Sequence, residues 1–210
     1  QDLITDGALW TAALHSLILG LSSATVAVGL ALLAVTCFYL YEFIGRKFQY
    51  SLIFMLIISP DIVMGITLLL LFNFINLPLG FISLFLAHTT LSLPFAIATI
   101  YSRIVSINPN LVEAAKDLGA SDCRIFTHIM VPLLRPAIIA AWLLSFTLSL
   151  DDLIVSYFVS GPEFEILPLR IYSMTRLGVT PTINALCTVT FTISLLLVIL
   201  SQMVLKNAND

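Results

Sequence analysis

Charged residues are scarce in this chain: they make up 10% of its 210 residues, whereas hydrophobic residues make up 60%. A soluble globular domain carries about 25% charged residues, and a single core of ordinary proportions does not bury this much apolar surface. The net charge of −3 comes with no basic patch, which argues against a nucleic-acid partner. Together with a mean hydropathy of +1.07, this scarcity of charge indicates that the chain is solvated by a lipid bilayer.

Three other features are missing, and each absence excludes a class of site. The cysteines form no CxxC pattern and the histidines have no ligand spacing, so neither a disulfide framework nor a metal site is predicted. No lysine follows a G-x-x-x-x-G pattern, which excludes a phosphate-binding loop and a nucleotide site of that kind. No basic segment precedes an apolar run at the start of the chain, so the sequence does not begin with a signal peptide.

Long apolar runs are what the chain has instead, and a helix that crosses the hydrocarbon needs roughly 20 such residues. The runs are too long for strands and do not alternate, so the predicted fold is an all-α polytopic membrane protein with one transmembrane domain over residues 1–210. Five spans are predicted, at about Leu14–Tyr41, Leu52–Phe72, Phe81–Tyr101, Ala137–Val159 and Ile183–Leu205.

The basic residues predict the orientation of these spans, because cytoplasmic loops are enriched in lysine and arginine. Seven lie in one set of loops, which includes the region 103–135 and the C-terminus, and only Arg170 and Arg176 lie in the other. We therefore expect the C-terminus and the 103–135 loop inside, and the 160–182 loop outside. Five spans then leave the N-terminus outside, so a further helix is expected upstream.

The cytoplasmic loop has a pattern of its own. Asn108 and Pro109 suit a helix start, and Gly119 suits a left-handed helix end. Ser121 is expected to cap a second short helix that ends near Pro132. The first helix has one apolar face with helical spacing, formed by Leu111, Ala114, Ala115 and Leu118. On this pattern alone, the face suits either a partner protein or the chain's own membrane domain and the lipid interface.

The loop sequence "EAAKDLGASDCRIFTHIMVPLLRP" resembles the EAA loop of the permease subunits of ATP-binding-cassette (ABC) importers, with Val131 in place of the usual leucine. The resemblance implies a MetI-like fold, in which this loop docks into a separate cytoplasmic ATPase that binds ATP and Mg²⁺. The docking residues that it implies in this chain are Glu113, Ala114, Ala115, Asp117, Gly119, Ile129 and Pro132.

Four further segments extend the resemblance over nearly the whole chain: "SPDIVMGITLLLLF", "LPFAIATIYSRI", "SFTLSLDDLIVSYFVSGP" and "EILPLRIYSMTRLGVTP". They are similar to the PotC-type permeases of spermidine and putrescine importers in the bacterial inner membrane. The resemblance implies a transport subunit without enzymatic activity of its own. The implied partners are a homologous permease subunit (PotB-like), two ATPase subunits (PotA-like) and an external polyamine-binding protein (PotD-like).

Carboxylates inside the spans are the candidate substrate contacts. A charge at the centre of a membrane helix costs about 2.5 kcal/mol or more, so Asp61, Asp151 and Asp152 are expected to face a cavity or another helix. Trp142, Ser145, Ser149, Asp152 and Ser156 would form one polar stripe on a continuous helix. Adjacent carboxylates repel, and a polyamine relieves that repulsion while its methylene stem packs on aromatic rings.

The predicted substrate path therefore combines carboxylates with aromatic and hydroxyl side chains: Asp61, Trp142, Ser149, Asp151, Asp152, Tyr157 and Glu165. A structural role for the aspartates, such as a hydrogen bond to another helix, stays open. His88 is expected to be a packed or hydrogen-bonded polar residue. Three other functions also stay open: an ABC permease for another small solute, a proton-coupled transporter that uses the aspartates, and an intramembrane aspartyl protease, whose G-x-G-D context is absent.

Overall fold

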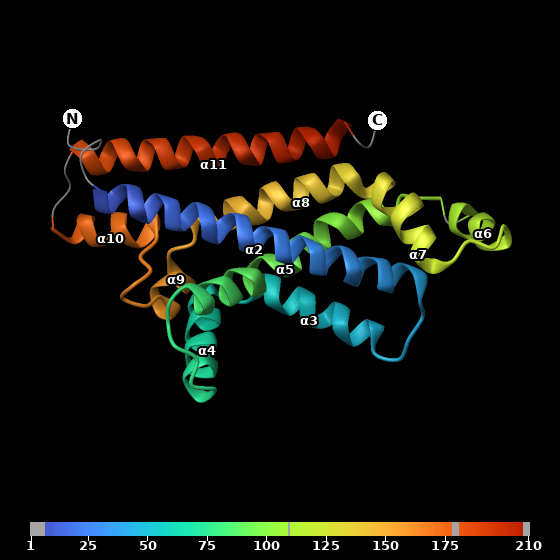
Figure 1. Ribbon diagram of the computed structural model, residues 1–210, viewed down its shortest axis with the longest axis horizontal. Coiled ribbons are helices and arrows are strands. Elements are labelled where there is room, and N and C mark those ends of the chain that lie inside the picture. Colours follow the sequence, from blue (N-terminus) through green and yellow to red (C-terminus); the bar gives the residue numbers. More distant parts are fainter. Residues whose placement is uncertain (1–6, 109, 178–180, 208–210) are drawn as a thin grey trace.

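The computed structural model describes residues 7–108, 110–177 and 181–207, and all of their regular structure is helical. In chain order the elements are α2 (Gly7–Leu40), α3 (Arg46–Ile58), α4 (Asp61–Phe74), α5 (Phe81–Ile104), α6 (Asn110–Asp117), α7 (Asp122–Ile125), the π-helical turn η1 (Phe126–Met130), α8 (Val131–Asp151), α9 (Ile154–Val159), α10 (Leu167–Leu177) and α11 (Pro181–Asn207). Figure 1 shows the long helices side by side along one axis, with α10 near one end, α6 and α7 near the other, and α4 and α9 below the bundle.

Within the described part of the chain, four helices are long and apolar enough to cross a membrane. These are α2, α5, the continuous helix Asp122–Asp151 and the Asn184–Val204 part of α11; α3 and α4 add a fifth span if they are counted as one. The predicted all-helical membrane fold is confirmed.

The second span is broken, and the prediction of one helix over Leu52–Phe72 is wrong. The axes of α3 and α4 meet at 112°, and α4 points away from the bundle in Figure 1. The break falls at Ser59 and Pro60, which both have extended backbones. Proline lacks an amide donor and disfavours helical geometry in the residue before it, so α3 ends there. Asp61 consequently begins α4, where a carboxylate favours the positive end of the helix dipole.

The fourth span differs from its prediction at both ends. It begins at Asp122 rather than Ala137, because α7, η1 and α8 form one helix, and the second loop helix does not end near Pro132. In the π-turn the amide of Val131 donates to the carbonyl of Phe126, five residues back. This wider turn relieves the crowding of the Pro132 ring against the preceding turn. Ser121 lies at the N-cap position of α7, but its side chain makes no capping hydrogen bond.

At its outer end the fourth span stops at Asp151, and Asp152 has an extended backbone with φ −69° and ψ 119°. A separate short helix, α9, follows from Ile154. The predicted polar stripe from Trp142 to Ser156 therefore does not lie on one continuous helix. Both carboxylates of the aspartate pair lie at a break in the span, where backbone groups lose their helical partners.

The first helix of the 103–135 loop begins and ends as predicted. The side chain of Asn108 accepts a hydrogen bond from the amide of Asn110 at 3.0 Å, and Gly119 has a left-handed φ of +77°. Pro109 lies outside the described residues. Val112 is the buried side chain of α6, and it packs into a core cluster that also contains Ile104, Ile125 and other residues from α2, α5 and α8. The loop helix is therefore attached to three spans, at the ends that lie nearest the 103–135 loop.

Small side chains bring α2, α5 and α8 together. Ala24, Ala27 and Ala31 on α2 are fully buried, as are Ala96 on α5 and Ala141 on α8. Helices in lipid associate by close van der Waals packing rather than by a hydrophobic drive, and small residues at the contact permit that approach. Leu19, Leu84 and Val155 form part of a second cluster at the outer ends.

The α4–α5 and α9–α10 loops meet backbone to backbone at Gly161. A Cβ atom on Gly161 would lie 2.0 Å from the carbonyl oxygen of Leu79, far inside van der Waals contact. Nearby, the hydroxyl of Ser83 donates to the carbonyl of Val159 at 2.7 Å. The position of the outer loops therefore depends on the absence of a side chain at residue 161.

We predict that Gly161→Ala destabilises the protein by about 1–3 kcal/mol, the usual cost of overpacking, because backbone has to move to admit the methyl group. Thermal unfolding of the purified protein in detergent measures this change. Gly29→Ala is the matched control, since no atom lies within 4 Å of a Cβ there. An unfolding midpoint equal to that of the wild type in Gly161→Ala would contradict the prediction.

Candidate functional site

The break between α8 and α9 gathers polar side chains from five helices. Asp151 and Asp152 occupy the break itself, and Ser149 and Ser156 lie on its two sides. Other helices contribute His88 from α5, Ser23 from α2 and Ser194 from α11. A polar cluster of this kind inside a span indicates a functional role, since isolated polar groups are costly in hydrocarbon.

Asp152 points inward, and its carboxylate caps the start of α9. Its Oδ1 atom accepts a hydrogen bond from the amide of Val155 at 3.2 Å. Its Oδ2 atom accepts from both the amide and the hydroxyl of Ser156, at 2.8 and 2.7 Å. The carboxylate is only 6% exposed, and it supplies acceptors to amides that the helix start leaves without partners. The chain itself therefore supplies the hydrogen-bond donors of Asp152.

His88 lies at the centre of the cluster and is completely buried. Its Nδ1 atom is 2.6 Å from the hydroxyl of Ser149, and its Nε2 atom is 2.8 Å from the hydroxyl of Ser156. The same Nε2 atom lies 3.5 Å from Oδ2 of Asp152. The prediction of a packed, hydrogen-bonded histidine is confirmed. The sequence did not reveal that one ring contacts both sides of the break.

Asp151 points the other way, and its side chain is exposed. The hydroxyl of Ser194 donates to its Oδ1 atom at 2.7 Å, which ties the end of α8 to α11. The two adjacent carboxylates thus have different surroundings: Asp152 is enclosed, and Asp151 faces out of the fold. Sequence reasoning missed Ser194, although a serine in the apolar fifth span was a signal for it.

The remaining predicted path residues fall in three places. Trp142 is partly buried between α8 and α2, where its indole donates to the hydroxyl of Thr25 at 3.0 Å. Asp61 is exposed at the start of α4, and its carboxylate has no hydrogen-bond or ion-pair partner in the described ranges. Tyr157 and Glu165 lie at the outer end, so the predicted set is not gathered at one point.

Tyr157 and Glu165 share an outer cavity of about 290 Å³ with Tyr172 and Arg176. The rings of Tyr157 and Tyr172 meet edge to face at 5.9 Å, and the guanidinium of Arg176 lies 4.7 Å from the centroid of the Tyr172 ring. Glu165 forms an ion pair with Arg170 at 3.5 Å. The cavity therefore combines a carboxylate with a tyrosine face that already holds one cation.

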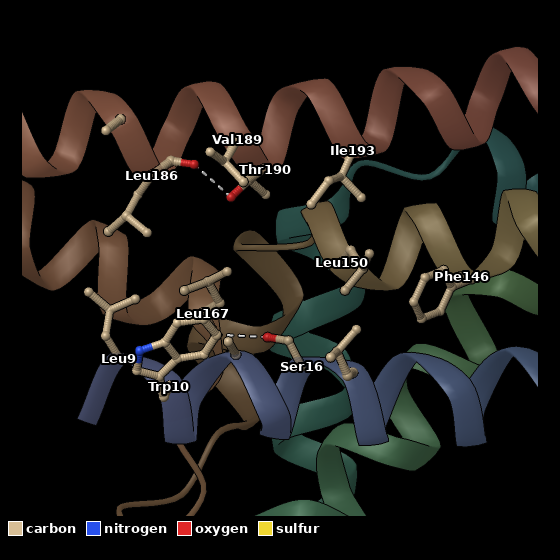
Figure 2. Close-up of a pocket in the computed structure, with 13 residues that line it drawn as sticks. Leu9, Trp10, Ser16, Phe146, Leu150, Leu167, Leu186, Val189, Thr190 and Ile193 are labelled. Atoms are coloured by element: carbon tan, nitrogen blue, oxygen red, sulfur yellow. Dashed lines mark hydrogen bonds between the residues drawn. The ribbon is translucent and has the colours of Figure 1, made fainter. Parts of the chain in front are cut away.

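A second cavity, of about 460 Å³, lies between α11 and the helices α2, α8 and α10 (Figure 2). Its two hydroxyls are already engaged: that of Ser16 accepts from the amide of Leu167 at 2.8 Å, and that of Thr190 donates to the carbonyl of Leu186 at 2.9 Å. No charged residue lines this cavity. An ammonium group would have no carboxylate to pair with there, so the cavity does not suit a cation.

The predicted docking residues divide into two groups. Glu113, Ala114, Asp117 and Gly119 are exposed on or beside α6, and Ala115 is half-buried. Ile129 and Pro132 are half-buried in the fourth span, where Ile129 packs against the inner core cluster. Leu118, on the face of the loop that was predicted to be apolar, is 89% exposed. This leaves a large apolar side chain uncovered beside the exposed docking residues.

The loop is also tied to the first span. The hydroxyl of Tyr41, just after α2, donates to a carboxylate oxygen of Asp122 at the start of α7. This hydrogen bond is the main reason that the pKa of the Tyr41 phenol is raised, because the phenol keeps its proton to donate.

In the described part of the chain, no three His, Cys, Asp or Glu side chains lie close enough to hold a metal ion.

Comparisons with known proteins agree with this architecture. A family model described as "Binding-protein-dependent transport system inner membrane component" matches residues 27–210. The chain is 47% identical over 205 residues to the spermidine/putrescine transport system permease protein PotC of Escherichia coli K12, covering 98% of this chain and 78% of that protein. It is 46% identical to the PotC protein of Haemophilus influenzae, covering 100% of this chain and 81% of that protein.

Two further similarities are more distant. The putrescine transport system permease protein PotI of Escherichia coli K12 is 38% identical over 194 residues, covering 89% of this chain and 69% of that protein. A solved inward-facing structure of the MetNI methionine ABC transporter superposes with a TM-score of 0.77, covering 97% of this chain and 99% of that one; at 14% identity it shows the fold alone. The chain belongs to the family of inner membrane components of binding-protein-dependent transport systems.

Proposed function

We propose that this chain is the permease subunit of an ABC importer that carries polyamines such as spermidine and putrescine into the cytoplasm. The observation that carries the proposal is the 47% identity, over nearly the whole chain, to a spermidine/putrescine permease. In this proposal a separate ATPase pair binds ATP and Mg²⁺ and drives transport. A homologous permease forms the other half of the path, and an external binding protein delivers the substrate.

The polar groups of the chain suit a flexible polycation. Asp151 is exposed at the break in the fourth span, and its Oδ2 atom has no hydrogen-bond partner within the described residues. We therefore assign it contact with an ammonium group, as a charge-assisted hydrogen bond. Asp61 would offer a second carboxylate, while Glu165 and Tyr157 would receive the polyamine at the outer cavity. Trp142, Ser149 and Asp152 have partners within the chain and would shape the path.

The first prediction concerns substrate contact. Asp151→Asn should lower ATP-dependent spermidine uptake about 10- to 100-fold, the usual effect of losing a hydrogen bond to a charged group. The measurement is radiolabelled uptake into liposomes that contain the assembled transporter, with loaded binding protein outside. Glu163→Gln, in the exposed external loop, is the control and should transport normally.

Three outcomes of this assay would contradict parts of the proposal. Normal uptake by Asp151→Asn would remove the substrate role of that carboxylate. Uptake that stops with a protonophore but continues without ATP would favour the proton-coupled alternative. Wild-type transport of another small solute in place of polyamines would change the substrate class.

The second prediction concerns the ATPase dock. Gly119 is exposed with φ +77°, and no other described residue has an atom within 4 Å of a Cβ there, apart from the two chain neighbours, so an added side chain would extend into open space on the face proposed to meet the ATPase. Gly119→Asn should reduce co-purification of the ATPase about tenfold if close backbone approach is needed. Gly45→Asn is the matched control, because Gly45 has φ +100° and equally open surroundings. Equal ATPase recovery from both variants would contradict the docking assignment.

The third prediction concerns orientation. Cys123 is exposed on α7, in the loop that we assign to the cytoplasm together with the C-terminus. With Cys37 and Cys187 changed to serine, a membrane-impermeant thiol reagent should label Cys123 only after the membrane is permeabilised. Glu163→Cys in the same background, with Cys123 also replaced, should be labelled in intact cells. The opposite labelling pattern would reverse the topology.

A further inference from the structure

We infer that His88 is a positioning residue: by holding the two sides of the α8–α9 break together, it sets where Asp151 presents its carboxylate to the substrate. The inference rests on the proposed function, in which Asp151 contacts a cation. It assigns to a buried histidine on α5 a role that neither the EAA loop nor the predicted substrate path includes.

Few backbone hydrogen bonds hold α8 and α9 in position relative to each other at the break. The helix ends at Asp151, Asp152 is extended, and α9 begins at Ile154, so helical hydrogen bonding is interrupted between the two parts. His88 comes from a different helix and contacts both parts, through Ser149 on α8 at 2.6 Å and Ser156 on α9 at 2.8 Å. One rigid ring therefore fixes the separation of the two helix ends.

The hydrogen atoms in this cluster have defined places. The single hydroxyl proton of Ser156 is donated to Oδ2 of Asp152. Ser156 can then only accept from His88, so Nε2 carries a proton. In the neutral ring Nδ1 is an acceptor, and Ser149 donates to it. The hydrogen bonds thus run in one direction, from Ser149 through His88 and Ser156 to Asp152, and no group in this series keeps an unused proton. The series is therefore rigid, because the membrane interior offers no substitute partners.

This cluster is connected to Asp151. Asp151 lies between Ser149, which His88 holds, and Asp152, which caps α9. On its other side, Ser194 of α11 donates to Asp151 at 2.7 Å. If His88 is lost, the last turn of α8 is no longer fixed relative to α9, and the Asp151 carboxylate, which Ser194 already holds, can shift with α11 away from its place at the break. His88 therefore acts on the substrate through Asp151 without touching it.

The chain also provides a matched control. Ser92 lies one turn further along α5 and is completely buried, yet its hydroxyl has no hydrogen-bond partner in the described part of the chain. Ser145 on α8 has the same burial and the same lack of a partner. Ser92→Ala therefore removes a polar group at the depth of the cluster without removing a hydrogen bond. It separates a general disturbance of the α5–α8 contact from loss of the His88 bridge.

The experiment uses the assembled transporter in liposomes with loaded binding protein. His88→Leu should lower spermidine uptake about tenfold, as expected when buried hydrogen bonds are lost, while basal ATP hydrolysis stays at the wild-type level. His88→Asn keeps a donor and an acceptor but is too short to bridge both serines, so it should be intermediate. In the Asp151→Asn background, His88→Leu should have no further effect, because both changes act on one contact.

A second readout reports the position of residue 151 directly. In a cysteine-free background, Asp151→Cys is modified with a cationic thiol reagent, and His88→Leu should slow this modification about tenfold, in proportion to the loss of access. Ser92→Ala should leave both uptake and modification unchanged.

The outcomes separate the two proposals. Unchanged modification and unchanged uptake in His88→Leu would overturn the inference, as would an additive loss in the double variant. If His88→Leu fails to assemble, His88→Asn decides by the same criteria. A wild-type complex that carries no polyamine would overturn the proposed function instead, while the modification rates would still test the role of His88.

Discussion

The fold depends on how a broken helix is satisfied inside a membrane. Hydrocarbon offers no hydrogen bonds, so backbone groups freed at a break have to find partners within the protein. At the α8–α9 break Asp152 supplies three acceptor contacts, to the amides of Val155 and Ser156 and to the hydroxyl of Ser156. This carboxylate makes a break possible at that depth, and the break in turn exposes Asp151.

The broken span made of α3 and α4 packs against the broken span made of α8 and α9. A Cβ on Gly65 of α4 would lie 2.6 Å from the Phe158 ring of α9 and 3.3 Å from the Cα atom of Val155. The two short helices beyond the breaks therefore rest on each other, and they share a core cluster with Leu19 of α2 and Leu84 of α5. Asp61 begins α4 after one break, and Asp151 ends α8 before the other. These two predicted path carboxylates therefore both lie where a span is interrupted.

The end of the molecule that carries α6 is built differently. There the contact is apolar: Val112 of α6 fits among the inner ends of α2, α5 and α8, and the hydrogen bond between Tyr41 and Asp122 links α2 to the start of α7. Because packed side chains resist compression, a displacement of α6 is transmitted to three spans together. The exposed residues that are predicted to dock thus lie on an element that is attached to the core and still open on its other face.

The sequence by itself determined the membrane class, the approximate places of the apolar segments, the start and end of α6 and the candidate carboxylates. All of these follow from local composition, from proline and glycine chemistry or from a long motif. Only the tertiary structure decided that the second and fourth spans are broken, that Asp151 and Asp152 have different surroundings and that His88 bridges the break. Hydropathy is averaged over about 20 residues, so it does not detect a break in a helix that is two residues long. The partners of His88 lie 61 and 68 residues away, on helices whose rotation is set by packing.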